Sequence, residues 1–268
     1  MAETRIGVIG CAGRMGRMLV AEIVATEGCA LAGGTARPGS ACIGQDVGEL
    51  AGVGRIGIAV GDSAEKLLRD SDVGVDFTTA TATVDHAALA SSLGKPIVIG
   101  TTGLSATEEA VIRAAAAKIP VVLAANTSLG INLLLGLVEQ VALRLGPDWD
   151  IEILEMHHKG KVDAPSGTAL ALGRAAAAAR GVSLEEAAQR GRDGITGPRR
   201  PGAIGLAALR GGDVVGEHHV IFAASGERLE LVHRATNRGI YARGAVRAAL
   251  WLKRQPPGLY GMKEVLEL

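Results

Sequence analysis

The sequence predicts an α/β protein in which a Rossmann-like, doubly wound parallel sheet is joined to an α+β part with an open mixed sheet. Three observations predict this fold. Short apolar strands alternate with helical segments through the first half, and a glycine-rich turn follows the first strand. The second half holds strand candidates that are joined by Gly-Gly-Asp and Ser-Gly-Glu turns.

Composition limits the classes of protein to which the chain can belong. The 268 residues are 48% hydrophobic but only 2% aromatic, so Ala, Val, Ile and Leu must build the core. The formal net charge is zero, which argues against a nucleic-acid or membrane-surface binder, because such proteins carry a basic patch. Cys11, Cys29 and Cys42 show no paired spacing, and the chain has neither a signal-peptide pattern nor an apolar run of transmembrane length. We therefore expect reduced thiols and a cytoplasmic protein.

The first predicted strand, RIGVIG, leads into a glycine-rich turn with the spacing Gly10-x-x-Gly13-x-x-Gly16. In a strand–turn–helix context, Gly13 would let the backbone approach a pyrophosphate, and Gly16 would let the helix pack on the strand. The N-terminus of the helix would supply unpaired N–H groups to the phosphate. The apolar positions of this helix are expected to be Met18, Leu19, Ile23 and Val24.

Four further apolar segments predict the other strands of the parallel sheet. Each ends in a loop of small polar residues, and ligands of such sheets bind just beyond the carboxyl ends of the strands. In this context the glycine turn predicts a dinucleotide site, whereas the turn alone would also fit a bare strand-to-helix connection. The helix over 105–118 opens with a capping-box pattern, Ser105 and Glu108. The expected strands are 29–36, 73–79, 96–103 and 119–126, with helices over 83–94 and 105–118 between them.

The end of the second strand bears on the choice of dinucleotide. An NAD site usually has an acid there for the ribose 2′-hydroxyl, but the sequence Gly-Thr-Ala-Arg at 34–37 has none. Arg37 is placed to meet a 2′-phosphate, and Arg14 could assist it. We predict that NADPH is used at least as well as NADH. The alternative is that Arg37 is only a solvated turn residue.

The second half changes character. An apolar helix is expected over 128–146, followed by a strand in which Ile151, Ile153 and Leu154 face one way and Glu152 and Glu155 face the other. Three more strands are expected within 203–235, and we expect most strands of this sheet to be antiparallel. A helical pattern returns over 242–254 and could pack on the first domain.

A new helix is expected to start at Ser166-Gly167-Thr168, with either hydroxyl as its cap. The first backbone N–H groups, at Gly167 and Thr168, would face outward at the positive end of the helix dipole and bind an anion. Because the phosphate-binding turn is already assigned to the first half, a carboxylate of a small substrate is the simplest anion.

Groups that can transfer protons come just before this helix start. His157, His158 and Lys161 lie close together in the chain, and histidine titrates near neutral pH. Adjacent histidines on a strand point to opposite faces, so at most one should face a cleft directly. Metal binding is disfavoured, because two adjacent histidines seldom ligate one ion. The second pair, His218-His219, has no companion lysines or helix start and is interpreted as strand residues.

These motifs together resemble the 4-hydroxy-tetrahydrodipicolinate reductase (dihydrodipicolinate reductase) family, in order along nearly the whole chain. The stretch HHKGKVDAPSGTA at 157–169 is far more specific than the glycine turn. The other matching motifs are GCAGRMG at 10–16, DFTTATAT at 76–83, VIGTTG at 98–103, AANTS at 124–128 and RGGDVVGEHHVIF at 210–222.

The resemblance implies an NADPH- or NADH-dependent oxidoreductase of the diaminopimelate route to lysine. Such enzymes reduce a cyclic dicarboxylate, with hydride delivered to ring C4 and a proton to the adjacent carbon. The resemblance implies that residues 1–127 and 240–268 form a dinucleotide-binding domain, and that residues 128–239 bind substrate and join the subunits of a homotetramer. From the net charge and the spacing of the histidines, we expect no metal, nucleic acid or membrane partner. The hydroxylated ring and its dehydrated form both stay open as the true substrate.

The resemblance also assigns roles to matching residues. His157 would donate or accept the proton, and Lys161 would donate one. His158, Gly167 and Thr168 would bind the substrate. The dinucleotide would be bound by Gly10, Cys11, Ala12, Gly13, Arg14, Met15, Arg37, Gly100, Thr101, Thr102, Ala124, Ala125, Asn126 and Thr127.

The sequence departs from the family pattern at two positions, and two other functions are compatible with parts of the sequence. Ala36 stands where many members carry an acid for the ribose, and Thr127 replaces a larger apolar residue. One rival is another two-domain NAD(P) dehydrogenase acting on an aldehyde or sugar, although its acylating form would need a cysteine in the middle of the chain. The other is a redox-sensing nucleotide-binding regulator, which would bind NADPH yet tolerate the loss of His157 and Lys161.

Overall fold

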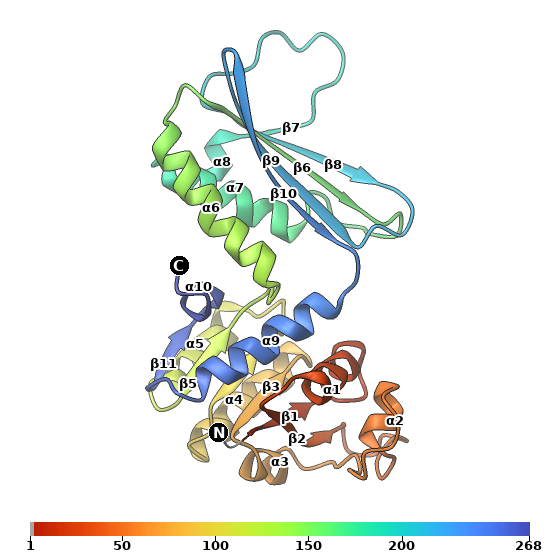
Figure 1. Ribbon diagram of the computed structural model, residues 1–268. Helices are drawn as coiled ribbons and strands as arrows, with labels where there is room; N and C mark the ends of the chain where they lie inside the picture. The colour runs from red at the N-terminus through yellow and green to blue at the C-terminus, as the bar shows by residue number, and fades with distance from the viewer. Residues whose placement is uncertain (1–2) are drawn as a thin grey trace. The chain divides into compact units, whose positions relative to one another are not determined.

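The computed structural model describes residues 3–268, and these divide into two compact units. The first unit holds the described residues up to Leu129 together with Gly239–Glu267. The second holds Gly130–Arg238 and Leu268. Figure 1 labels the helices and strands of both units.

The first unit is built on a six-stranded parallel sheet in the order β11-β5-β4-β3-β1-β2, which confirms the predicted Rossmann-like sheet. The order reverses direction between β1 and β3, so loops that leave these neighbouring strands open a crevice at their carboxyl ends. The edge strand β11 was not predicted. The strands are β1 (Thr4–Ile9), β2 (Cys29–Thr35), β3 (Val73–Asp76), β4 (Ile97–Ile99), β5 (Pro120–Leu123) and β11 (Gly258–Tyr260).

Helices cover both faces of this sheet, because adjacent residues of a strand point to opposite sides. Val98 of β4 packs in a cluster with α1 and α9, whereas its neighbour Ile99 packs in a second cluster with α3, α4 and α5. The predicted capping box at Ser105 and Glu108 is present at the start of α5. The helices are α1 (Arg14–Ala25), α2 (Val47–Ala51), α3 (Ala64–Asp70), α4 (Ala80–Ser92), α5 (Ala106–Ala116), α9 (Gly239–Leu252) and α10 (Met262–Val265).

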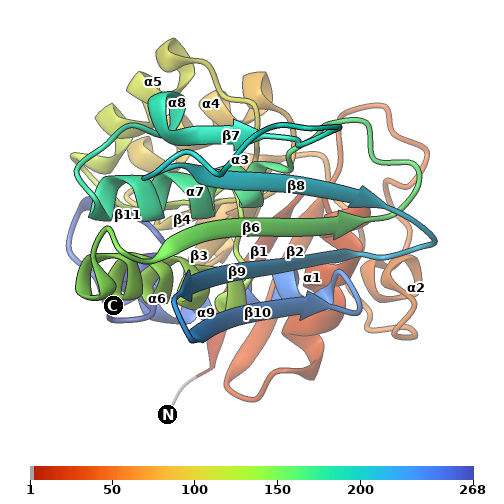
Figure 2. The same cartoon turned by 90° about the horizontal axis from the view of Figure 1, so that it is seen from above.

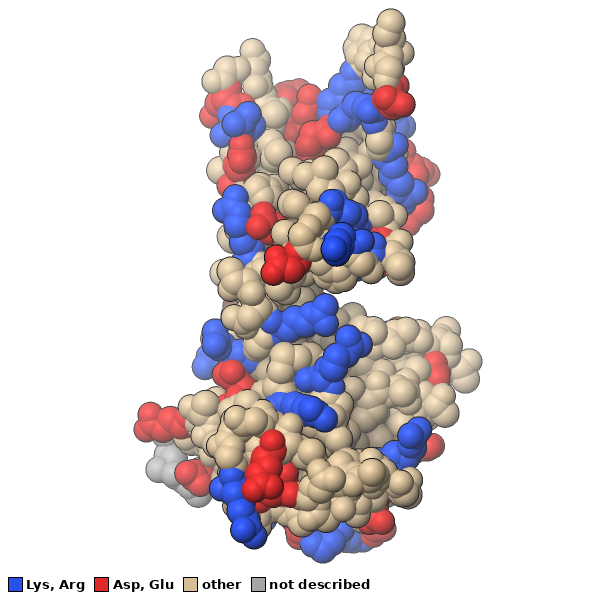
Figure 3. Space-filling view, turned by 90° about the vertical axis from the view of Figure 1, so that its right-hand side faces the viewer, with Lys and Arg blue, Asp and Glu red and all other residues tan. Residues whose placement is uncertain are grey.

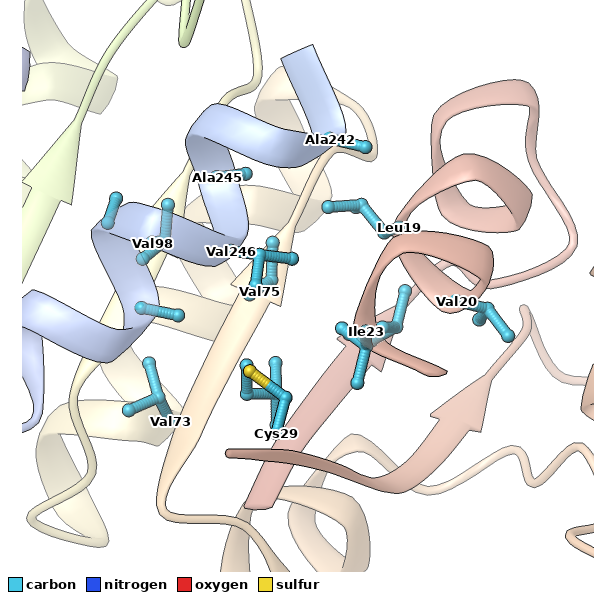
Figure 4. Packing of buried hydrophobic residues seen from close by; sticks show 14 of the residues in the cluster. Leu19, Val20, Ile23, Cys29, Val73, Val75, Val98, Ala242, Ala245 and Val246 are labelled. Carbon is cyan, nitrogen blue, oxygen red and sulfur yellow. The ribbon is translucent and has the colours of Figure 1, made fainter. Parts of the chain in front are cut away.

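Figure 4 shows the first cluster, in which Leu19 and Ile23 of α1 and Val246 of α9 lie around Val75 of β3. Small and β-branched residues fill the space between the two helices and the sheet, as the nearly aromatic-free composition requires. The expectation that Val24 belongs to the buried face of α1 is wrong, since it is 47% exposed and Val20 takes the place on that face. The apolar stripe follows positions 16, 19, 20 and 23, the spacing of 3.6 residues per turn.

The second unit holds a five-stranded sheet in the order β10-β9-β6-β8-β7. The predicted mixed sheet is confirmed: β6–β8 and β7–β8 are parallel, while β6–β9 and β9–β10 are antiparallel. Antiparallel pairs are half of the pairs and not the majority that we expected. The chain between β6 and β8 passes through α7 and α8, and such a crossover returns it in the same direction. The strands are β6 (Asp150–His157), β7 (Ala188–Arg190), β8 (Ile204–Arg210), β9 (Gly216–Ala224) and β10 (Glu227–Ala235).

Three helices accompany the sheet of the second unit: α6 (Leu129–Leu145), α7 (Gly167–Ala179) and α8 (Leu184–Ala187). They pack on one face of the sheet around Phe222 and Leu172, which are fully buried. Figure 2 shows the opposite face of β9, β6 and β8, over which no other element of the described second unit lies. Strand alternation puts a set of apolar residues on that face: Leu154, Met156, Leu209, Ile221 and Val232.

The surface carries both signs of charge. On the face in Figure 3, Lys and Arg side chains lie interspersed with Asp and Glu. None of the described helices combines the length and the apolar character that a membrane crossing needs.

Candidate active site

The turn after β1 closes tightly on the start of α1. Gly10 has a φ of +78°, and a Cβ there would lie 2.7 Å from the methyl carbon of Thr78. A Cβ on Gly16 would collide with the carbonyl oxygen of Gly10 and the backbone of Cys11. Gly13 is the N-cap of α1 and makes no side-chain cap. The turn therefore leaves backbone N–H groups at a helix N-terminus without covering side chains, which suits a phosphate.

Cys11 contributes only its backbone to this turn. Its N–H donates to the carbonyl oxygen of Thr35 at 2.9 Å, which ties the turn to the end of β2. The side chain is 2% exposed, and burial raises the pKa of the thiol to about 11. All three cysteines of the chain are free thiols.

A cavity of about 590 Å³ opens beside the turn. Arg37 lines it, together with the glycines of the turn, whereas Arg14 is exposed at the first position of α1. Sequence reasoning missed Asp62 and His86, which also line it. They could not be found from spacing, since they come from a loop and a helix distant in sequence from the turn. The predicted residues along this cavity are Gly10, Ala12, Gly13 and Arg37.

His86 is held by a buried carboxylate. Asp76, at the end of β3, is fully buried and lies 2.8 Å from Nδ1 of His86 through Oδ2. Its other oxygen accepts bonds from the backbone N–H and the hydroxyl of Thr78 at 2.8 and 2.6 Å. The hydroxyls of Thr83 and Thr101 lie 2.7 Å apart, so this network reaches the loop after β4. The loops at the carboxyl ends of β3 and β4 are thus fixed to each other.

A second cavity of the first unit, about 270 Å³, brings together most of the remaining dinucleotide candidates. The side chain of Thr127 is not free to reach a ligand there, because it is buried and its hydroxyl donates to the carbonyl oxygen of Tyr241 at 2.7 Å. Ala124 lies in neither of these two cavities; its N–H donates to the carbonyl oxygen of Ile99 at 3.0 Å. The candidates along this cavity are Met15, Gly100, Thr101, Thr102, Ala125, Asn126 and Thr127.

In the second unit, the proton-transfer candidates gather at the end of β6. The expectation that Glu155 faces away from Ile151 and Ile153 is wrong: β6 is regular, so alternate residues share a face, and Glu155 is fully buried beside them. A buried carboxylate requires partners, and the sequence pattern alone could not supply them. Nδ1 of His157 lies 2.6 Å from Oε2 of Glu155. Arg210, at the end of β8, donates to both oxygens at 2.8 and 2.9 Å.

Ser166 joins this cluster to the start of α7. Its hydroxyl accepts the N–H of Ala169 at 3.1 Å, so the cap is Ser166 and not Thr168. Its own N–H donates to Oε1 of Glu155 at 3.0 Å. A Cβ on Gly167 would meet nothing within 4 Å, so this helix start is open on one side.

His218 also belongs to the cluster, although its sequence context gave no sign of this. It is 4% exposed, its Nε2 lies 3.1 Å from the hydroxyl of Ser166, and its ring stands edge-on to His157 at 5.2 Å. Burial, and secondly the charge of His157, lower the pKa of His218 to about 4. The missed signal is strand pairing, because His218 is the partner of Glu155 across β6 and β9.

Lys161 lies in the loop between β6 and α7. Its Nζ donates to Oδ1 of Asp163 at 2.8 Å, its backbone N–H donates to the carbonyl oxygen of His158, and its side chain is 20% exposed. Lys159, two residues earlier, is exposed. Imidazole, ammonium and an open helix start thus lie along one short segment, a set that can bind a carboxylate and transfer a proton. No group of three His, Cys, Asp or Glu that could hold a metal ion occurs within residues 3–268.

Comparison with known proteins covers nearly the whole chain. Family models described as dihydrodipicolinate reductase, N-terminus and C-terminus, match residues 4–127 and 130–266. The 4-hydroxy-tetrahydrodipicolinate reductases of Rhizobium rhizogenes and Magnetococcus marinus are 55% and 53% identical to it; each match covers 98% of this chain, and 97% and 98% of theirs. A dipicolinate-bound dihydrodipicolinate reductase from Paenisporosarcina sp. TG-14 has a similar fold, with a TM-score of 0.77 at 23% identity over 97% of both chains. The chain therefore belongs to the dihydrodipicolinate reductase family and is an oxidoreductase of that family.

Proposed function

We propose that the chain reduces 4-hydroxy-tetrahydrodipicolinate, or its dehydrated ring, to tetrahydrodipicolinate with NAD(P)H in the diaminopimelate route to lysine. The observation that carries this proposal is the cluster of the second unit, where His157 is held by a buried carboxylate close to Lys161 and to the open start of α7. Family membership and the glycine turn of the first unit support the same reaction.

Separate groups of residues bind the substrate and transfer the proton. The backbone N–H groups of Gly167 and Thr168 hold one substrate carboxylate, and His158 contacts the substrate. When bound, the reduced dinucleotide supplies the hydride, which ring C4 accepts. On the dehydrated ring, His157 and Lys161 deliver the proton to the adjacent ring carbon, which completes the addition of a hydride and a proton across the double bond. If the hydroxylated ring is the form that binds, its 4-hydroxyl group and a proton from the adjacent carbon leave as water before the hydride arrives.

Steady-state kinetics test this assignment. With substrate generated by the synthase and NADPH consumption followed, Lys161→Ala should lower kcat by about two to four orders of magnitude, because the proton donor is lost. Lys159→Ala is the matched control: it removes an exposed lysine from the same loop and should change kcat by less than about threefold.

The kinetic result also separates the rivals. An unchanged rate in Lys161→Ala would contradict the assigned proton donor. Binding of NADPH without any turnover of the dicarboxylate by the wild type would favour the nucleotide-binding regulator. Turnover of an aldehyde or a sugar in place of the dicarboxylate would favour the other dehydrogenase.

We further infer that NADPH is used at least as well as NADH. Arg37 lines the same cavity as Gly10 and Gly13, and Ala36 offers no acid to a ribose hydroxyl. Asp62 lines that cavity too and can accept a hydrogen bond from the ribose, which would keep NADH acceptable.

Substitution of the two charged groups tests this inference. Arg37→Ala should lower kcat/KM for NADPH by about tenfold or more, because one charge-assisted hydrogen bond to the 2′-phosphate is lost. The same substitution should alter kcat/KM for NADH far less, since NADH has no 2′-phosphate. Asp62→Asn should affect NADH more than NADPH. Arg69→Ala, which removes an exposed arginine of α3, is the control. Equal losses for the two cofactors in Arg37→Ala, or a strong NADH preference of the wild type, would contradict the inference.

A homotetramer is the assembly that we propose, formed through the open face of the second sheet. On that face Leu209 of β8 pairs with Met156 of β6, while Leu154 of β6 and Val232 of β10 flank His219 of β9. Leu209 and Val232 are 48% and 40% exposed. Exposed apolar side chains gathered on one face mark association surfaces in soluble proteins.

A further inference from the structure

The carboxylate of Glu155 has more polar contacts than a structural ion pair needs. It is fully buried near the end of β6. Oε2 lies 2.6 Å from Nδ1 of His157 and accepts Nη1 of Arg210 at 2.8 Å. Oε1 accepts Nη2 of Arg210 at 2.9 Å and the N–H of Ser166 at 3.0 Å. One carboxylate therefore contacts the imidazole proposed for proton transfer and the helix start proposed for substrate binding.

The charge state of Glu155 follows from these contacts. Burial by itself would raise the pKa of this carboxyl group, but the hydrogen bonds from Arg210, His157 and the N–H of Ser166 lower it below the ordinary value. The forked guanidinium meets both oxygens, the geometry that best compensates a buried carboxylate. Glu155 is therefore ionised at neutral pH and can only accept hydrogen bonds.

An acceptor at this position decides which nitrogen of His157 carries the proton. Nδ1 must be the N–H that donates to Oε2, so Nε2 is the nitrogen left to exchange a proton with a ligand. Gly216 of β9 lies close to Nε2, since a Cβ added there would be 3.1 Å from that nitrogen, and glycine leaves this space open. Glu155 and His218 of β9 contact the ring of His157, Arg210 of β8 binds the same carboxylate, and the charge of Lys161 acts on His218. The lowered pKa of His218 leaves it uncharged at neutral pH.

We propose that Glu155 is a positioning residue: it fixes His157 as the Nδ1–H tautomer with Nε2 available for proton transfer, and through Ser166 it sets the α7 start against the same imidazole. Arg210 keeps the carboxylate ionised and in place. This inference rests on the proposed function for its kinetic consequence, but not for the tautomer.

The test combines a spectroscopic and a kinetic measurement. Solid-state ¹⁵N NMR of sedimented, histidine-labelled protein at about pH 9, where histidine is ordinarily neutral, distinguishes Nδ1–H from Nε2–H whatever the size of the assembly. The six histidines are few enough for His157→Asn to assign the signal of His157. The variant is Glu155→Gln, which keeps the shape but offers an amide N–H to Nδ1. Glu152→Gln is the matched control, since Glu152 is a second β6 carboxylate paired with arginines, on the other face.

Wild-type His157 should be the Nδ1–H tautomer. Glu155→Gln should shift His157 toward Nε2–H and lower kcat about 10²-fold or more, as loss of an orienting carboxylate does elsewhere, with KM for the dinucleotide changed less than about threefold. Glu152→Gln should change neither the tautomer nor kcat appreciably. An Nε2–H tautomer in the wild type, or an unaltered tautomer and kcat in Glu155→Gln, would overturn the proposal.

The positioning role of Glu155 and the proposed reaction can fail independently of each other. A wild type that does not reduce the dicarboxylate but shows the Nδ1–H tautomer would refute the reaction and leave the positioning role standing. Should Glu155→Gln fail to fold, the wild-type tautomer alone decides.

Discussion

Burial of His218 makes stability depend on pH at the scale of a single residue. The unfolded side chain takes up a proton near pH 6.5, whereas the folded one, with its pKa lowered to about 4, stays neutral until much lower pH. The unfolded state therefore binds more protons across this window, and folding loses stability as the pH falls through it. The carboxyl group of Glu155 affects stability at lower pH than His218 does. Because its pKa is lowered in the folded state, its contribution to the free energy of unfolding is lost only as the pH falls below the pKa of an unfolded glutamate, about 4.3.

We predict that the free energy of unfolding of the second unit falls by about 2 kcal/mol between pH 6.5 and pH 4.5 because of His218. His218→Gln should remove most of this slope, whereas His219→Gln, its exposed-side neighbour, should keep it. Trp149 packs on the second core and Trp251 on the first, so urea unfolding followed by tryptophan fluorescence in a Trp251→Phe background reports on the second unit. The same slope in wild type and His218→Gln would contradict the prediction.

The residues of this cluster differ in how well the sequence predicted them. His157, Lys161 and the helix start at Ser166 are adjacent in the chain, so their types and spacing carried the information. Glu155 was assigned to the wrong face because a lone carboxylate in an alternating strand normally faces solvent, and the guanidinium that makes its burial possible comes from Arg210 of β8. The sequence did not predict the role of His218 either, because His218 meets Glu155 only through the pairing of β9 with β6.

At the scale of elements, α9 carries the chain back onto the first sheet by close approach of backbone. It packs against α1, and Gly244 meets the loop at Thr127, where a Cβ would collide with the carbonyl oxygen of Thr127. Only glycine leaves room for this contact, which sits beside the hydrogen bond from Thr127 to Tyr241.

We predict that Gly244→Ala destabilises the first unit by about 1–3 kcal/mol, the usual cost of overpacking against atoms that cannot move away. Gly61→Ala is the control, because its Cβ would meet neighbours only at 3.9 Å or beyond, an ordinary contact. Urea unfolding in a Trp149→Phe background measures the effect through Trp251. Equal stability of the two variants would contradict the prediction.

Elements with an apolar pattern of their own were predictable, and those without one were not. The predicted parallel strands and the helices with clear apolar periodicity all form, but three of the strands end several residues earlier than expected. The strands expected over 96–103 and 119–126 end at Ile99 and Leu123. The strand expected over 73–79 ends at Asp76, whose carboxylate binds Thr78 and His86. The three-residue strands β7 and β11 have no periodicity of their own and form only by pairing with β8 and β5. The parallel pairing of β6 with β8 depends on the path of the intervening chain, which no local pattern encodes.

At the scale of the whole molecule, the open face of the second sheet predicts self-association. The purified protein should have four times the 27.3 kDa mass of the chain, and Val232→Asp should dissociate it, since a charge would be buried without a partner. Val24→Asp, at a similarly exposed valine of α1, should leave the mass unchanged. Sedimentation velocity measures both. A monomeric wild type, or an assembly untouched by Val232→Asp, would contradict the proposed interface.

The proposed reaction requires that His157 and Lys161 of the second unit and a nicotinamide bound by the first unit reach the same substrate ring. A crystal structure with nicotinamide dinucleotide and pyridine-2,6-dicarboxylate measures this directly. We predict the nicotinamide C4 at about 3–3.5 Å from a carbon of the dicarboxylate ring, with His157 and Lys161 next to that ring and a carboxylate at Gly167 and Thr168. Side chains of His157 and Lys161 turned away, or lying more than about 12 Å from the nicotinamide, several times a reacting distance, would contradict the account.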